Sequence, residues 1–141
     1  MSNAEGNIIL RTNPGLRTAR QVHVIDDDPS LCMVLEKMLN DLGYDVTTHT
    51  KARPEILHAM TELDLLFIDM IMPGMNGLQV LDILAGNQIK SAVVLMSATN
   101  DVLATAQALA GLNGIRLIGV LRKPFRNDDL MKVLEDAQQA D

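Results

Sequence analysis

Aromatic side chains are scarce in this chain of 141 residues, which has no Trp, one Tyr and two Phe. A surface for stacking nucleic-acid bases is therefore not expected. Basic side chains are also in the minority, with 12 Lys and Arg against 18 Asp and Glu, so the formal net charge is −6. Because such a surface repels phosphate backbones, the composition argues against direct nucleic-acid binding.

Cysteine and long apolar runs are equally rare. The single cysteine, Cys32, excludes an internal disulfide framework and a Cys-rich zinc site, and a lone thiol fits a reducing, cytoplasmic location. No apolar run approaches the ~20 residues of a membrane helix, and the first residues lack the hydrophobic region of a signal peptide. We expect residues 1–19 to be a disordered leader or tag that precedes one domain over residues 20–141.

Five short apolar segments alternate with five amphipathic segments along the chain. The expected strands are residues 22–25, 44–48, 63–68, 92–96 and 115–121, and the expected helices are 29–42, 54–61, 76–84, 101–110 and one from 127 onward. The expected helix caps are Asp28, Asn76 and Asn127, and the expected helix ends are Gly43, Gly86 and Gly111. This alternation indicates a doubly wound α/β fold, (βα)₅, whose parallel sheet is covered on both faces.

Polar residues follow the expected strands at their carboxyl ends, where ligands of parallel sheets bind. They are Asp26, Asp27 and Asp28 after the first strand, Asp69 after the third, Ser97 after the fourth and Lys123 after the fifth. Carboxylates that meet there repel one another, and oxygen ligands without His or Cys favour Mg²⁺. A Lys ammonium and a Ser hydroxyl suit phosphoryl oxygens, and a carboxylate can attack phosphorus. The sequence therefore predicts a magnesium-dependent phosphoryl site.

Other reactive residue types have simpler explanations. Asp28 is better explained as a helix cap than as a metal ligand. The three histidines, His23, His49 and His58, show no metal-ligand spacing and are interpreted as surface or edge residues. Cys32 lies beside the apolar stripe of a helix and is expected to be a small packing residue.

Four segments in this order resemble the receiver domain of two-component response regulators, over about residues 21–138. They are residues 24–29 (Val-Ile-Asp-Asp-Asp-Pro), 66–77 (Leu-Phe-Ile-Asp-Met-Ile-Met-Pro-Gly-Met-Asn-Gly), 95–98 (Leu-Met-Ser-Ala) and 122–125 (Arg-Lys-Pro-Phe). The resemblance implies a flavodoxin-like sheet with strand order 2-1-3-4-5. It also implies that Asp69 takes a phosphoryl group from a sensor histidine kinase or a histidine phosphotransfer protein.

The same resemblance implies roles for the other strand-end residues. The implied Mg²⁺ ligands are Asp26, Asp27, Asp69 and the backbone carbonyl of Ile71. Ser97 and Lys123 would bind the phosphoryl group, and the bond between Lys123 and Pro124 would be a cis peptide. Such a domain phosphorylates and dephosphorylates itself, and it is not expected to be an enzyme for any other substrate.

In this family, phosphorylation switches a surface that corresponds here to residues 101–110, 115–121 and the last helix. The resemblance also implies that a homodimer could form through this surface. One residue departs from the pattern, because Val120 occupies the position of a Tyr or Phe whose ring turns inward in the switched state. Residues 109–121 resemble receivers attached to cyclic-di-GMP phosphodiesterase output domains. An output domain of that kind, absent from this chain, is the implied effector.

Two alternatives remain open. In a haloacid-dehalogenase-type phosphatase, Asp26 would be the nucleophile and Asp28 the general acid, although the motif from Asp69 to Gly77 would then be unexplained. In a pseudo-receiver, the same fold would dock partners without being phosphorylated, which the complete set of acidic residues, Ser97 and Lys123 disfavours.

Overall fold

A computed structural model describes residues 21–140, with side chains through residue 135, so the predicted leader at 1–19 lies outside the described residues. The strands are β1 (Gln21–Ile25), β2 (Val46–His49), β3 (Asp64–Asp69), β4 (Ala92–Ser97) and β5 (Leu117–Arg122). The helices are α2 (Pro29–Asp41), α3 (Pro54–His58), α4 (Gly77–Gly86), α5 (Asn100–Leu112) and α6 (Asn127–Ala140). None of the described helices is long and apolar enough to cross a membrane.

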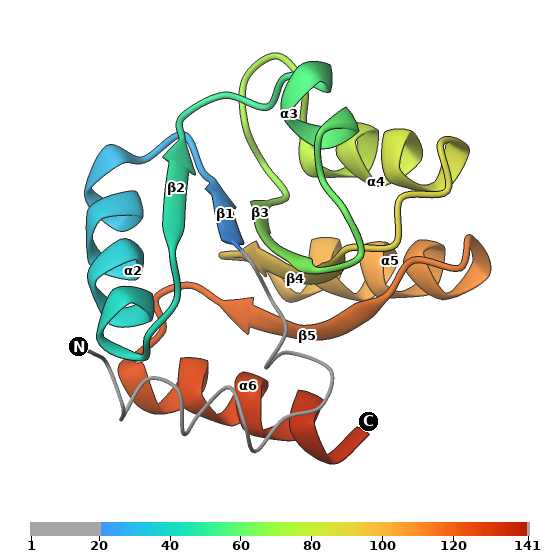
Figure 1. Cartoon of the computed structure of the whole chain (residues 1–141). Coiled ribbons are helices and arrows are strands. Elements are labelled where there is room, and N and C mark those ends of the chain that lie inside the picture. Colours follow the sequence, from blue (N-terminus) through green and yellow to red (C-terminus); the bar gives the residue numbers. More distant parts are fainter. Residues whose placement is uncertain (1–20, 141) are drawn as a thin grey trace.

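The strands form one parallel sheet in the order β2-β1-β3-β4-β5 (Figure 1). Helices α2 and α6 cover one face, and α3, α4 and α5 cover the other. Side chains of β3 alternate between the layers, with Leu65 and Phe67 packed toward α2 and α6, and Leu66 and Ile68 toward the other helices. The predicted doubly wound α/β fold and its strand order are confirmed.

The first helix begins and ends as its sequence predicts. The Asp28 side chain caps α2, because its Oδ1 accepts backbone N–H groups from Ser30 at 2.9 Å and Leu31 at 3.4 Å. Pro29 occupies the first turn, where its missing N–H costs nothing. Gly43 follows the helix with a φ of 97°, a left-handed conformation that favours glycine.

At the end of α3 and at the start of β2, local hydrogen bonds shift the boundary from the predicted one. The helix expected to reach residue 61 ends at His58, since the backbone and hydroxyl of Thr61 both donate to Asp64 Oδ2 and form a turn. The strand expected from residue 44 begins at Val46, because the Tyr44 N–H still bonds to the Leu39 carbonyl of α2 at 3.1 Å.

The region around β5 also departs from expectation. The α5 helix continues past Gly111 to Leu112, and Gly114, with a φ of 70°, makes the turn instead. The strand starts at Leu117 rather than 115, and a bulge follows, since Val93 pairs with Leu117 whereas Val94 pairs with Gly119. A Cβ atom at Gly119 would lie 2.6 Å from Val133 Cγ1, so any larger residue would force the Val133 side chain of α6 to shift.

The cap of the last helix lies one residue earlier than predicted. Arg126, not Asn127, occupies the cap position, because its carbonyl accepts from Leu130 N–H at 3.2 Å. Its own N–H donates to Asp129 Oδ2 at 2.8 Å. The carboxylate of the first turn thus satisfies a donor that lies outside the helical ladder.

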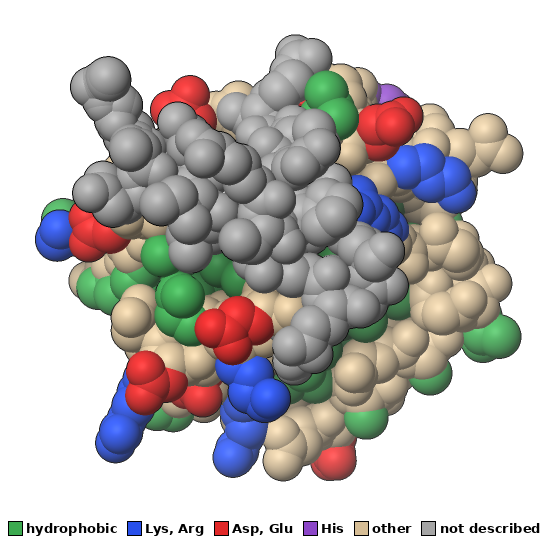
Figure 2. Space-filling view, turned by 60° about the horizontal axis from the view of Figure 1, so that its bottom comes forward, with side chains coloured by type: hydrophobic (Ala, Val, Ile, Leu, Met, Phe, Trp, Pro, Cys, Tyr) green, Lys and Arg blue, Asp and Glu red, His purple; other side chains and the backbone are tan. Residues whose placement is uncertain are grey.

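The face on the α6 side carries charges of both signs (Figure 2). On the face viewed from the α6 side, acidic and basic side chains lie next to one another (Figure 2). On α2, for example, Lys37 Nζ lies 3.2 Å from Asp41 Oδ2.

Core packing on α2 can be tested with a matched pair of substitutions. Leu39→Ala is expected to lower the free energy of unfolding by about 2–5 kcal/mol, because Leu39 is fully buried against the sheet. Met33 lies on the same helix and is 71% exposed, so Met33→Ala is expected to change it by less than ~0.5 kcal/mol. Urea unfolding followed by circular dichroism measures both, and equal losses would contradict the packing described.

Candidate functional site

Three carboxylates converge at the carboxyl edge of the sheet. Ile25 of β1 pairs with Ile68 of β3, so the residues that follow them, Asp26 and Asp69, are neighbours. Oxygens of Asp26, Asp27 and Asp69 all lie within 4.8 Å of one another. Asp26 and Asp69 are buried, whereas Asp27 is exposed. The structure therefore brings together acids that stand 43 positions apart in the sequence.

Lys123 supplies the positive charge of this cluster. Its Nζ lies 2.6 Å from Asp26 Oδ2 and 3.3 Å from Asp69 Oδ2. Burial alone would lower the pKa of Lys123, but the ion pairs with both carboxylates raise it above its usual value. The Lys123 N–H donates to the Ser97 carbonyl at 2.8 Å, and the expected cis peptide to Pro124 is confirmed.

The surroundings of Asp69 disfavour the charged form of its carboxylate. Burial raises its pKa to about 6, and the neighbouring Asp26 charge adds to this, while the Ile71 N–H and Lys123 oppose it. The Ile71 N–H donates to Asp69 Oδ1 at 3.2 Å. The carboxylate is thus oriented by the backbone on one oxygen and by an ammonium on the other.

The two carboxylate oxygens of Asp26 have different surroundings. Its Oδ1 accepts the Asp28 N–H at 2.9 Å, and its backbone N–H donates to the His49 carbonyl at 3.0 Å. Its Oδ2 is buried next to Lys123 but accepts no well-directed hydrogen bond within the described residues. Because a second buried carboxylate and an exposed one lie beside it, this oxygen-only set fits Mg²⁺.

Ser97 ends β4 and lies almost fully buried. Its Oγ accepts the Thr99 N–H at 3.2 Å and lies 3.4 Å from Thr99 Oγ1. Thr99 is a residue that the sequence analysis missed, and its only signal was a hydroxyl two positions after Ser97. The two hydroxyls form a polar pair at the end of a strand adjacent to the one that carries Asp69.

The loop after Asp69 is closed by tight backbone packing. Gly77 N–H donates to the Met70 carbonyl at 3.2 Å, while Met70 N–H extends the sheet through a 2.9 Å bond to the Met96 carbonyl. A Cβ atom at Gly77 would lie 2.6 Å from Met70 Cα. Because Gly77 has no side chain, the backbone of Met70 can pack directly against it. This packing positions the adjacent Ile71 N–H, which donates to Asp69.

Comparison with known proteins agrees with this geometry. The family described as the response regulator receiver domain matches residues 22–135. The chain belongs to this family. The receiver domain is 27% identical over 124 residues to the transcriptional regulatory protein FixJ of Bradyrhizobium diazoefficiens, covering 86% of this chain and 58% of that protein. It is 33% identical over 114 residues to the two-component response regulator ARR11 of Arabidopsis thaliana, covering 78% of this chain and 21% of that protein.

Solved structures show the same fold. A response regulator from Colwellia psychrerythraea has a TM-score of 0.74 at 25% identity, covering 87% of this chain and 99% of that one. The Vibrio cholerae chemotaxis protein CheY4 has a TM-score of 0.68 at 22% identity, covering 83% of this chain and 97% of that one, and shows likeness of fold alone. The receiver domain spans 58% and 21% of the lengths of FixJ and ARR11. It is therefore the response regulator receiver component of a two-component system.

The closing of the loop after Asp69 can be tested at its glycine. Gly77→Ala is expected to lower the free energy of unfolding by about 1–3 kcal/mol, because the new Cβ overlaps backbone atoms of Met70. The amide resonance of Ile71 is expected to shift as its bond to Asp69 is displaced. Both are measured by chemical unfolding and amide NMR spectra.

Gly86 provides the control, since it ends the same helix and a Cβ atom there meets nothing within 4 Å. Gly86→Ala is expected to leave the Ile71 resonance unchanged and to stabilise the helix by up to ~1 kcal/mol. The same Ile71 shift in both variants would show that Gly77 has no special contact with the loop.

Proposed function

We propose that this receiver domain accepts a phosphoryl group on Asp69 from a histidine kinase or a histidine phosphotransfer protein, in a Mg²⁺-dependent reaction in the cytoplasm. The observation that supports this most is the buried Asp69 carboxylate, 3.3 Å from the Lys123 ammonium and within 4.8 Å of Asp26 and Asp27. A purely structural Asp at the end of a buried strand has no need of two further acids and a lysine.

In the proposed transfer, a carboxylate oxygen of Asp69 forms a bond to phosphorus while the bond from phosphorus to the donor imidazole nitrogen breaks. The electron pair of the broken bond returns to that imidazole. Asp26, Asp27, Asp69 and the Ile71 carbonyl would hold Mg²⁺, which neutralises charge on the phosphoryl oxygens when it is bound.

The chain's own residues then stabilise the acyl phosphate. Lys123 already contacts both buried carboxylates, so its ammonium can pair with a phosphoryl oxygen without crossing the site. The Ser97 hydroxyl would donate to another oxygen and give up its present contact with Thr99. Hydrolysis of the acyl phosphate by water resets the domain, so we propose self-phosphorylation and autodephosphorylation and no turnover of another substrate.

The response would travel through the strands that carry Ser97 and Lys123. The acyl phosphate carries about −1.5 to −2 charge at the end of β3, in place of the −1 of the ionised carboxylate. Lys123 is tied to the Ser97 carbonyl, so a shift of either moves the end of β5. The proposed output and dimer surface is the one that α5, β5 and α6 build around that strand.

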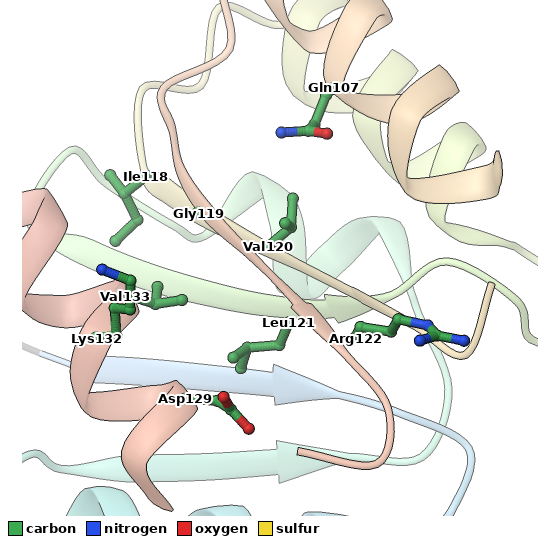
Figure 3. Close-up of a pocket in the computed structure, with 9 residues that line it drawn as sticks. All are labelled: Gln107, Ile118, Gly119, Val120, Leu121, Arg122, Asp129, Lys132 and Val133. Atoms are coloured by element: carbon green, nitrogen blue, oxygen red, sulfur yellow. The ribbon is translucent and has the colours of Figure 1, made fainter. Parts of the chain in front are cut away.

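A groove crosses this surface. It has a volume of about 400 Å³ and is bounded by Gln107 of α5 and by Lys132 and Val133 of α6 (Figure 3). Gly119 and Val120 of β5 line it between them. Since Val120 carries no ring, a change here would act through backbone displacement of β5 rather than through rotation of an aromatic side chain.

The effector is proposed from the relatives and from residues 109–121. Several relatives are named as DNA-binding regulators, including NtrC of Klebsiella pneumoniae, which is 32% identical over 116 residues that cover 81% of this chain and 24% of that protein. A solved chain named as adenylate cyclase of Rhodopirellula baltica has a TM-score of 0.64 at 27% identity and is covered to 87%. This loosely supports an output in cyclic-nucleotide signalling, of which a cyclic-di-GMP phosphodiesterase is our candidate.

The phosphoacceptor can be identified by intact mass. Incubation with acetyl phosphate and Mg²⁺ is expected to add one phosphoryl group to the wild-type chain and none to Asp69→Asn, because the nucleophilic oxygen is replaced by an amide. Asp26→Asn retains the Asp69 nucleophile and is expected to keep a residual, slower labelling. Label that persists in Asp69→Asn but vanishes in Asp26→Asn would instead favour the phosphatase alternative, in which Asp26 is the nucleophile.

The role of Lys123 can be separated from metal binding. Lys123→Ala is expected to bind Mg²⁺ still, because the carboxylate cluster remains, but to lose the response of the β5 amides to beryllofluoride. Amide NMR spectra recorded with Mg²⁺, before and after beryllofluoride, measure both effects. A response equal to that of the wild type would remove Lys123 from the mechanism, and no response in the wild-type chain would favour a pseudo-receiver.

A further inference from the structure

Two histidines from different strands meet on the sheet face that α3, α4 and α5 cover. His23 of β1 and His49 of β2 lie on the same side of the sheet as Ile25, which packs toward those helices. His23 Nδ1 lies 3.2 Å from His49 Nε2, and the ring centroids are 5.4 Å apart with 19° between the ring planes. The facing nitrogens thus lie between two nearly parallel rings.

The sequence offered no sign of this pair, because its members stand 26 positions apart and metal-ligand spacing is sought within a few residues. Parallel pairing aligns Ile25 with His49 and His23 with Thr47, so the two imidazoles are diagonal neighbours. Gln21 and Thr47, hydrogen-bonded through their side chains, extend the same polar row. Both rings are only partly buried and remain open to small solutes.

The environment favours the neutral form of both imidazoles. Burial lowers the pKa of His23, against the opposing charge of Asp64, and burial, His23 and Arg53 together lower the pKa of His49. Neutral imidazole is the form that binds a metal, so an environment that favours this form does not oppose binding. The ring that donates in the free pair has only to move its proton to its other nitrogen.

We propose that His23 Nδ1 and His49 Nε2 together bind a divalent transition-metal ion such as Zn²⁺. Two imidazole nitrogens on one tetrahedral Zn²⁺, at Zn–N distances of about 2.0–2.1 Å, lie roughly 3.4 Å apart. The observed 3.2 Å is within a few tenths of an ångström of that separation. Both ligands stand on paired strands of one sheet, so little conformational entropy is lost on binding. Water or a donor atom of a partner completes the coordination.

The site differs in chemistry from the acidic cluster. Imidazole nitrogens select Zn²⁺, Cu²⁺ or Ni²⁺, whereas the carboxylates of Asp26, Asp27 and Asp69 select Mg²⁺. Cys32 does not join the pair, because it packs in the core under α2 and α6, and burial raises the pKa of its thiol to about 11. The proposal does not depend on phosphorylation of Asp69.

The test is a Zn²⁺ titration of the full, untagged chain in excess Mg²⁺, which saturates the acidic cluster. The chain has three histidines, so ¹⁵N and ¹H spectra of the imidazoles report on each separately. One Zn²⁺ per chain is expected by calorimetry, with ring shifts at His23 and His49 and none at the exposed His58. Affinity is expected to fall as the pH is lowered, because protons compete for the ligands.

Variants make the assignment specific. His23→Gln and His49→Gln are each expected to weaken Zn²⁺ binding about tenfold or more, since even loss of an outer-shell partner has that effect. His58→Gln is the control and is expected to bind as tightly as the wild type. Circular dichroism checks folding, and if one histidine variant unfolds, the other decides.

Three results would overturn the proposal. They are the absence of Zn²⁺ binding to the wild-type chain, undiminished affinity in a folded His23→Gln or His49→Gln variant, and ring shifts confined to His58. Failure of phosphorylation in the acetyl phosphate experiment would leave these outcomes unchanged, so the two proposals fail separately.

Discussion

The carboxyl edge of the sheet holds more negative charge than its one lysine neutralises, and the rest of the site is organised around that imbalance. Two carboxylates about 4 Å apart repel by roughly 4 kcal/mol at an effective dielectric of 20. Asp26 and Asp69 are both buried, and Lys123 lies between their oxygens at 2.6 and 3.3 Å. One ammonium for three neighbouring acids leaves a deficit that a cation from solution can fill.

This constraint explains why the fold places polar residues where it does. Buried strands deliver Asp26, Asp69 and Ser97 to one edge, while the loop after β5 brings Lys123 back over it. Each charged group is also fixed by the backbone, Asp69 through the Ile71 N–H and Asp26 through the Asp28 N–H. A site oriented in this way needs little rearrangement before the proposed reaction at phosphorus.

Much of this architecture could be predicted because its signals are local. Continuous apolar runs mark β3 and β4, Asp28 with Pro29 marks the start of α2, and the residues after each strand follow from the parallel order. The boundaries that were predicted wrongly depend on individual contacts rather than on a repeating pattern. The hydrogen bond from Tyr44 to Leu39 delays the start of β2. The bulge before Gly119 lies where α6 packs closely on β5. Hydrophobic periodicity reveals neither contact.

The histidine pair is the clearest case of information that exists only in the folded chain. Taken alone, each histidine is interpreted as an edge residue, and only the register of β1 against β2 makes the two imidazoles neighbours. His49 also connects the two sites, because its carbonyl accepts the Asp26 N–H at 3.0 Å while its ring faces His23. The position of the edge strand β2 therefore bears on the carboxylate that lies deepest in the acidic cluster.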